Sequence, residues 1–167
     1  MNQIPVTENA DAKALELAKR VLRIEAQAVA GLIDRLDAGF PRAVALIRAC
    51  HGRVVVSGVG KSGHIARKIA ATLASTGTPA YFVHAAEAAH GDLGMITRDD
   101  VLIALSNSGE SEELLTIVPL VKRQGGRLVA ITGNPPSSLA RAADAHLDAG
   151  VAEEACPLNL APTASTT

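Results

Sequence analysis

The sequence predicts an α/β fold, a doubly wound five-stranded parallel sheet of flavodoxin-like strand order with a long helix ahead of it. Short runs rich in Val, Ile and Leu alternate with segments of helical periodicity after residue 50, which is typical of βαβ units. The run Val54–Val56 has no polar residue, as expected of a strand buried on both faces. The two most polar, glycine-bearing loops follow the first and third runs. In the order 2-1-3-4-5 these two strands are neighbours at the switch point, where ligands bind.

Length and composition fit one domain with a substantial core. The chain has 167 residues, of which 48% are hydrophobic and only 2% aromatic, so Ala, Val, Leu and Ile must fill the core. A net charge of −1 gives no sign of a nucleic-acid or anionic-membrane surface. Cys50 and Cys156 form no CxxC pair, which fits a reducing compartment. No apolar run approaches a membrane span, and we expect a cytoplasmic protein without nucleic-acid or membrane partners.

Residues 1–50 are predicted to form a helical segment ahead of a domain at residues 51–167. From Asp11 onward, apolar residues recur every three or four positions and predict one long amphipathic helix. They are Leu17, Val21, Ile24, Ala28, Leu32 and Leu36. A shorter helix is expected at Arg42–Cys50. We assign no chemistry to the long helix and expect it to cover a sheet face or an oligomer interface.

The remaining elements follow in alternating order. Strands are expected at 54–56, 80–83, 101–105, 128–131 and 145–147, and helices at 62–75, at 138–142 and between the third and fourth strands. Pro119 lies inside the helix between those strands, where it permits a kink. The segment 84–95 reads as irregular or briefly helical.

The first polar loop, SGVGKSG at residues 57–63, connects a strand to a helix. This arrangement presents backbone N–H groups to an anion, so we expect Gly60, Lys61 and Ser62 beside a phosphate group. The loop is no Walker motif, because Val55 stands where that motif needs Gly. Its glycine spacing matches the dinucleotide fingerprint, but no acid follows at the ribose-binding position, which disfavours a Rossmann cofactor. A tight turn without any ligand is the alternative.

The second polar loop, SNSGES at residues 106–111, precedes a helix. Hydroxyl and amide groups at a helix N-terminus bind phosphate without a strong local positive charge. The candidates are Ser106, Asn107, Ser108 and Ser111. Ordinary N-capping is the alternative, since Ser and Asn are the commonest caps. Three serines that face a second Gly/Ser turn favour phosphate binding.

Carboxylate and imidazole groups lie near the same predicted sheet edge. Glu113 is in the first turn of the helix after the serine-rich loop, and Glu154 follows the fifth strand. His84 and His90, with Glu87 between them, have a loose metal-like spacing that matches no standard zinc signature. We expect these histidines to form a polar pocket wall and predict no metal.

Three segments together resemble the sugar isomerase (SIS) domain of bacterial D-arabinose 5-phosphate isomerases. They are GVGKSGHIARKIAATLASTGTPAYFVHAAEAAHGDLGM, SNSGESEE and EEACPLNLAPTASTT. The resemblance runs from about Gly52 to the last residue, and its most specific parts are HGDLGM and the final segment. It implies interconversion of D-ribulose 5-phosphate and D-arabinose 5-phosphate through a cis-enediol. The product supplies 3-deoxy-D-manno-octulosonate for lipopolysaccharide, or a related capsule or sugar-alcohol pathway. It also implies no cofactor and a homotetramer with sites at subunit interfaces.

The resemblance implies roles for single residues as well. The family's catalytic lysine matches Lys61, two family glutamates match Glu113 and Glu154, and its phosphate-binding hydroxyls match Ser62, Ser106, Ser108 and Ser111. Lys61 would stabilise the developing enediolate, and a glutamate would transfer the proton. Glu154 is the first choice as base, because it reaches the sheet edge away from the phosphate. Glu113 would then position a substrate hydroxyl or orient Lys61.

Two other functions fit the same phosphate site: a non-catalytic sugar-phosphate-binding SIS module and an SIS isomerase for another sugar phosphate. Residues 1–50 offer no basic recognition helix of the kind that precedes regulatory SIS domains. The family continues beyond this point into an apolar helix, a motif with a catalytic histidine and usually two CBS modules. We therefore expect a fragment with apolar surface left on one face of its sheet, and with weak activity.

Overall fold

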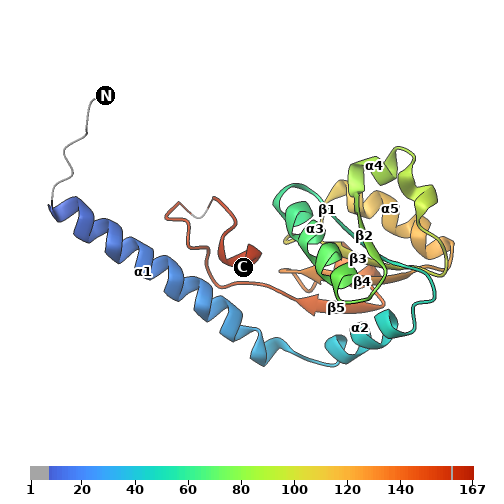
Figure 1. Ribbon diagram of the computed structural model, residues 1–167, viewed down its shortest axis with the longest axis horizontal. Helices are drawn as coiled ribbons and strands as arrows, with labels where there is room; N and C mark the ends of the chain where they lie inside the picture. The colour runs from blue at the N-terminus through green and yellow to red at the C-terminus, as the bar shows by residue number, and fades with distance from the viewer. Residues whose placement is uncertain (1–7, 159) are drawn as a thin grey trace.

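The computed structural model describes residues 8–158 and 160–167 (Figure 1). Five parallel strands form one sheet in the order β2-β1-β3-β4-β5, which confirms the predicted class and strand order. Their bounds are β1 Val54–Gly58, β2 Ala80–His84, β3 Val101–Leu105, β4 Arg127–Thr132 and β5 Ala145–Asp148. Gly58 pairs with both His84 and Leu105, so the loops after β1, β2 and β3 all leave the sheet at the carboxyl ends of its strands.

Helices cover both faces of the sheet. One face packs against α4 (Ala85–Ala89), α5 (Glu112–Arg123) and α6 (Ser138–Ala142), and the other against α2 (Gly39–Arg48) and α3 (Gly60–Ser75). The central strands β1 and β3 are buried throughout, which explains their uninterrupted apolar runs. Because α2 belongs to this core, the packed unit begins before the expected boundary at residue 51.

The start of α3 differs from the expected one in a way that affects the site. The helix begins at Gly60, and not at Ser62, so Lys61 and Ser62 lie in its first turn. A Cβ on Gly63 would lie 2.9 Å from the Gly58 carbonyl oxygen. These two glycines therefore let the strand and helix backbones pack directly, which accounts for the dinucleotide-like spacing without a dinucleotide.

The long helix α1 (Glu8–Gly31) projects from the layered sheet (Figure 1). It is shorter than the apolar stripe suggested, because the chain leaves the α-helix at Gly31, enters the 3₁₀ helix η1 (Ile33–Arg35) and is extended at Leu36. Glycine is a poor helix former and favours this end point. Leu32 and Leu36 therefore do not continue the helical stripe. The first seven residues of the chain, which belong to the predicted helical segment, lie outside the described residues.

The inner face of α1 packs on the C-terminal segment and not on a sheet face. Ile24 forms a small core with Ala155 and with Ala164 of the 3₁₀ helix η3 (Ala164–Thr166). Many other apolar side chains of this region stay exposed: Leu15, Leu17, Leu22, Val29, Ile33, Leu36 and Phe40. Of the two expected roles for α1, covering a sheet face is wrong. No helix in the described part of the chain is both long and apolar enough to cross a membrane.

Candidate functional site

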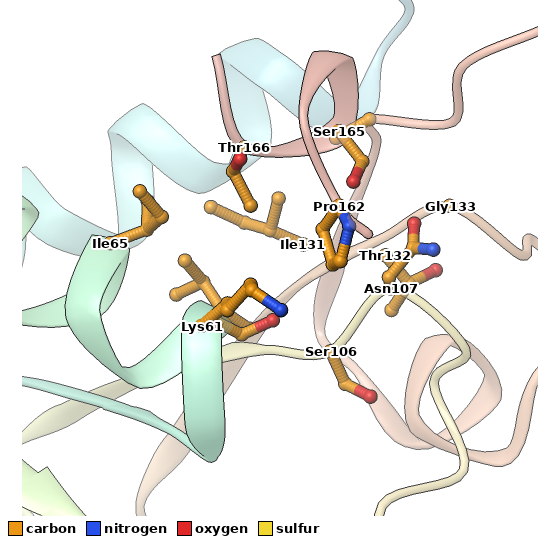
Figure 2. A pocket seen from close by; sticks show the side chains of 13 residues that line it. Lys61, Ile65, Ser106, Asn107, Ile131, Thr132, Gly133, Pro162, Ser165 and Thr166 are labelled. Carbon is orange, nitrogen blue, oxygen red and sulfur yellow. The ribbon is translucent and has the colours of Figure 1, made fainter. Parts of the chain in front are cut away.

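A small pocket of about 70 Å³ opens at the predicted switch point (Figure 2). Its walls come from the first turns of α3, the loops after β3 and β4, and the C-terminal segment. The lining residues are Lys61, Ser62, Ile65, Leu105, Ser106, Asn107, Ile131, Thr132, Gly133, Ala149, Pro162, Ser165 and Thr166. Pockets for complete small ligands usually measure roughly 300–1,000 Å³. This one therefore fits only one end of a ligand, such as a phosphate group.

Two helices begin beside the pocket, and neither has a side-chain cap. The N-cap of α3 is Val59, and the N-cap of α5 is Ser111, whose hydroxyl instead lies 2.7 Å from Ser106 Oγ. The short helices α4 and α6 are capped by their own N-cap side chains. Both N-termini thus lack a side-chain cap. The first-turn residues Lys61 and Ser62 of α3 line the pocket, so the dipole of this helix favours an anion there. For Ser111, the N-capping alternative does not hold.

The serine-rich loop is shaped by its own hydrogen bonds. Ser106 is buried, lines the pocket and accepts a hydrogen bond from the Gly109 N–H at 3.1 Å. Ser108 Oγ accepts from the Glu110 N–H at 3.2 Å. Ser108 and Ser111 lie outside the pocket lining and hold the loop, whereas Ser106 and Asn107 line the pocket.

Helix α6 also holds the serine-rich loop in place through hydrogen bonds from its backbone. The Ser138 N–H donates to Glu110 Oε1 at 2.8 Å, and the Leu139 N–H donates to the Gly109 carbonyl at 3.1 Å. The hydrogen bonds from the backbone and side chain of Ser138 lower the pKa of Glu110 below its ordinary value. The loop is therefore pre-organised by contacts within the described chain.

Lys61 is the only ionisable residue among those that line the pocket. Figure 2 shows its amine pointing into the space between the loop of Ser106 and Asn107 and the C-terminal segment. Gly60, the residue before it, has φ +58° and open space where a Cβ would lie, although it does not line the pocket. A cation beside open helix N-termini suits an anionic ligand or a developing negative charge.

Neither predicted glutamate lines this pocket. Glu113 is half-buried in the first turn of α5. Glu154 Oε2 accepts hydrogen bonds from Thr163 N at 2.8 Å, Thr163 Oγ1 at 3.0 Å and Ser165 N at 3.2 Å. Burial alone would raise the pKa of Glu154, but interactions with Ser165 and Thr163 outweigh it and lower the pKa. The Ser165 hydroxyl itself has no hydrogen-bond partner within the described structure, so the backbone N–H is the better-defined contact.

The structure does not bring His84 or His90 to the pocket. His84 Nδ1 accepts a hydrogen bond from the Ala86 N–H and so caps α4, and His90 is the exposed C-cap of the same helix. Within the described ranges, no group of three or more His, Cys, Asp or Glu side chains gathers where a metal ion would bind.

Several lining residues had no signal in the sequence reading. Thr132 and Gly133 follow β4, and Pro162, Ser165 and Thr166 belong to the C-terminal segment. The switch-point rule placed the loops after β1 and β3 at the site. A position directly after β4, the next strand in the sheet, was the available clue to Thr132 and Gly133.

A doubly wound domain with a pocket at the carboxyl ends of its strands, beside the uncapped N-terminus of α3, has the architecture of ligand-binding α/β proteins. The chain is a member of the SIS domain family, whose model matches residues 46–167. The predicted family is thus confirmed.

The chain is similar to curated enzymes and to a solved complex. It is 60% identical over 150 residues to the arabinose 5-phosphate isomerase KdsD of Pseudomonas aeruginosa. It is 57% identical over 152 residues to KdsD of Escherichia coli K12. These matches cover 90% and 91% of this chain but 46% of each relative, so the chain spans about half the length of these enzymes. E. coli CFT073 c3406 in complex with A5P superimposes with a TM-score of 0.88 at 46% identity, covering 93% of this chain and 82% of that one.

Proposed function

We propose that this chain carries the isomerase domain of an aldose–ketose isomerase that interconverts D-arabinose 5-phosphate and D-ribulose 5-phosphate. The observation that carries the proposal is its identity of 57–60% to KdsD enzymes over 90% of its length. The likeness to c3406, solved with A5P, supports the same class of substrate. The reaction would supply 3-deoxy-D-manno-octulosonate synthesis for lipopolysaccharide, in the cytoplasm.

The phosphate of the substrate would bind in the pocket between α3 and α5. The open N–H groups of both first turns, together with the hydroxyls of Ser62 and Ser106, offer donors to phosphate oxygens. Asn107 adds an amide at the same wall. Ser108 and Ser111 would contribute by holding the loop in this shape.

The chemistry would consist of removing a proton from the carbon next to the carbonyl and returning it to the neighbouring carbon. Lys61 would donate a hydrogen bond to the oxygen on which the enediolate charge develops. Glu113 and Glu154 are the candidate carboxylates for the proton transfer, a contribution typically worth about 10²–10⁴-fold. The proposed chemistry needs neither a metal nor an organic cofactor.

We propose further that the protein works as a homotetramer whose sites are completed at subunit interfaces. A pocket of about 70 Å³ has room for only one end of the substrate, so residues outside its lining must hold the sugar end. The exposed apolar side chains of α1 support burial against another subunit.

A non-catalytic sugar-phosphate-binding module is the second candidate. It is favoured by one observation, the lack of a carboxylate among the residues that line the pocket of the described chain. Such a module would bind the sugar phosphate without converting it.

A direct assay separates these functions. The protein is incubated with D-arabinose 5-phosphate in D₂O. ¹H and ¹³C NMR follow the formation of D-ribulose 5-phosphate and the deuterium at C1 of this product and at C2 of the remaining D-arabinose 5-phosphate. We expect both to appear, and Lys61→Ala to reduce turnover by about 10²-fold or more. Lys68→Ala, which changes an exposed lysine on the same helix, is the matched control. Binding without any exchange would support the non-catalytic module, and faster conversion of a hexulose or heptose phosphate would reassign the substrate.

A further inference from the structure

The C-terminal segment supplies one whole wall of the pocket. Pro162, Ser165 and Thr166 line it directly, and we call residues 162–166 the C-terminal wall. Figure 2 shows these residues across the pocket from Ser106. Within the described residues, the wall contains the 3₁₀ helix η3 and contacts the rest of the chain through Ala164, which packs on Ile24.

A closed set of hydrogen bonds, centred on Glu154 and Thr163, fixes the wall. Thr163 Oγ1 accepts from the Ala155 N–H at 2.7 Å and donates to Glu154 Oε2 at 3.0 Å. The same carboxylate oxygen accepts from the backbone N–H groups of Thr163 and Ser165. The Thr163 hydroxyl thus has its donor and an acceptor site both engaged, and the residue bridges the two halves of the segment.

Because residues next to these hydrogen bonds are buried, losing one of the bonds should change the position of the wall. Ala155 and Ala164 are 8% and 5% exposed and pack on Ile24 of α1. The Ala155 N–H is therefore poorly placed to exchange its Thr163 partner for water, and an unsatisfied buried donor is costly. Loss of the Thr163 hydroxyl should move the segment rather than leave it in place.

We infer that Glu154 is a positioning residue, which together with Thr163 latches the C-terminal wall against the phosphate pocket, and is not the proton-transfer base. This inference rests on the proposed function for its catalytic part and replaces the sequence-based first choice of base. The geometry supports it in two ways. Glu154 does not line the pocket, and one of its oxygens is the shared acceptor of three hydrogen bonds.

Two substitutions distinguish a positioning role of Glu154 and Thr163, which we call the latch, from a role of Glu154 as the proton-transfer base. Glu154→Gln keeps an acceptor oxygen but cannot take a proton, whereas Thr163→Val keeps the carboxylate but breaks the bridge. For a base, Glu154→Gln should lower kcat by about 10²–10⁴-fold with little change in KM. For the latch, we expect Glu154→Gln to retain kcat within about 10-fold, and Thr163→Val to raise KM by about 5- to 30-fold. Thr163→Ser, which restores the hydroxyl, should return KM to within about 3-fold of the original.

A second set of measurements does not depend on turnover. In the original chain, we expect slow hydrogen exchange at the amides of Ala155, Thr163 and Ser165, and binding of inorganic phosphate by calorimetry. Glu154→Ala and Thr163→Val should speed exchange at these amides and weaken phosphate binding by about 5-fold or more. Circular dichroism checks that each variant is folded, and Thr163→Ser serves as the conservative control.

The outcomes are distinguishable. If the original protein shows no isomerisation, the proposed function fails, while amide exchange and phosphate binding still decide the latch. The positioning role of Glu154 is refuted if Glu154→Ala leaves both the hydrogen exchange at these amides and the phosphate binding unchanged. It is equally overturned if Glu154→Gln lowers kcat 100-fold or more with KM unchanged while Thr163→Val behaves like the original.

Discussion

Gly109 is the residue on which the shape of the serine-rich loop depends most strictly. Its φ of +68° lies in the left-handed region, and a Cβ there would lie 2.1 Å from Ser137 Oγ. The loop and α6 therefore approach each other as closely as the absence of a side chain allows. This contact places the Gly109 carbonyl where the Leu139 N–H reaches it.

Gly109→Ala should lower the free energy of unfolding by clearly more than backbone strain alone would. The left-handed conformation penalises a non-glycine residue by about 1–2 kcal/mol, and overpacking against Ser137 should add roughly 1–3 kcal/mol. Gly77→Ala is the matched control, since Gly77 has φ +95° but open space around the added Cβ. Urea unfolding of the two variants measures the difference. Equal losses of unfolding free energy in both would show that the contact with Ser137 is unimportant.

At the residue scale, the sequence predicted the side chains with a local signal. Ser106 and Asn107 directly follow one predicted strand, Lys61 and Ser62 belong to the glycine-bearing loop predicted after another, and all four line the pocket. Thr163 and the C-terminal wall could not be predicted from the sequence, because their position depends on hydrogen bonds across eight to eleven residues of irregular chain. His84 does not line this pocket, and its side chain accepts a hydrogen bond from the backbone of α4.

At the scale of elements, the strands and helices between β1 and β5 could be predicted closely. The presence of two helices before β1 could be predicted as well, but the end of the first could not. The expected strand 101–105 and helix 138–142 have the bounds that the structure shows. Their apolar runs and turn residues are local signals. The end of α1 at Gly31 was missed, since the apolar spacing continues through Leu36 even though the backbone does not. Tertiary contacts with the C-terminal segment, and not periodicity, decide where this helix packs.

Asp144 lies at the amino ends of the strands, on the opposite side of the sheet from the pocket, where it connects the start of β5 to β4 and α5. Its carboxylate accepts from the Leu128 N–H at 2.8 Å and from Lys122 Nζ at 3.1 Å, and its side chain is 15% exposed. Burial raises the pKa of Asp144, but the hydrogen bond from Leu128 and the hydrogen bond and charge of Lys122, with the charge of Arg127, outweigh it. The folded-state pKa is therefore lower than the ordinary value of 3.8.

Asp144→Asn should remove part of the acid sensitivity of the fold. A carboxyl with a lowered folded pKa stabilises the protein above its unfolded pKa, and this stabilisation is lost as the pH falls through the folded value. We expect the variant to lose about 1–3 kcal/mol of unfolding free energy at pH 7 and progressively less below pH 3.8. Denaturant titrations from pH 7 to pH 3 measure this. A constant difference over that range would contradict the assignment.

At the scale of the whole molecule, α1 is a helix with more apolar surface than its own chain covers. Leu15, Leu22 and Val29 recur every seven residues and are 57%, 66% and 48% exposed. Side chains at this spacing lie along one side of a helix. A helix that projects from the sheet in this way (Figure 1) offers the surface expected for the proposed oligomer.

Leu22→Glu should lower the oligomeric state while leaving the protomer folded. The side chain is exposed within the chain, so a charge there disturbs only a contact with another copy. Gln27→Glu, at an exposed position on another side of α1, tests how specific the effect is to this row. Light scattering after size-exclusion chromatography gives the mass, and circular dichroism checks the fold. An unchanged mass for Leu22→Glu would place the interface elsewhere.

The central claim is that a sugar phosphate binds with its phosphate at the N-termini of α3 and α5. A second hollow, at the other end of the sheet, is lined by Arg42, Arg98 and Arg127 and also by Asp99, Asp100 and Asp144. The arginines make this arginine-lined hollow the alternative site for an anion. Titration of the ¹⁵N-labelled chain with D-arabinose 5-phosphate distinguishes them by two-dimensional NMR. We predict that the largest shift changes occur at residues 60–62, 106–113 and 163–166. Changes centred on the arginine-lined hollow, with residues 60–62 and 106–113 unaffected, would contradict the account.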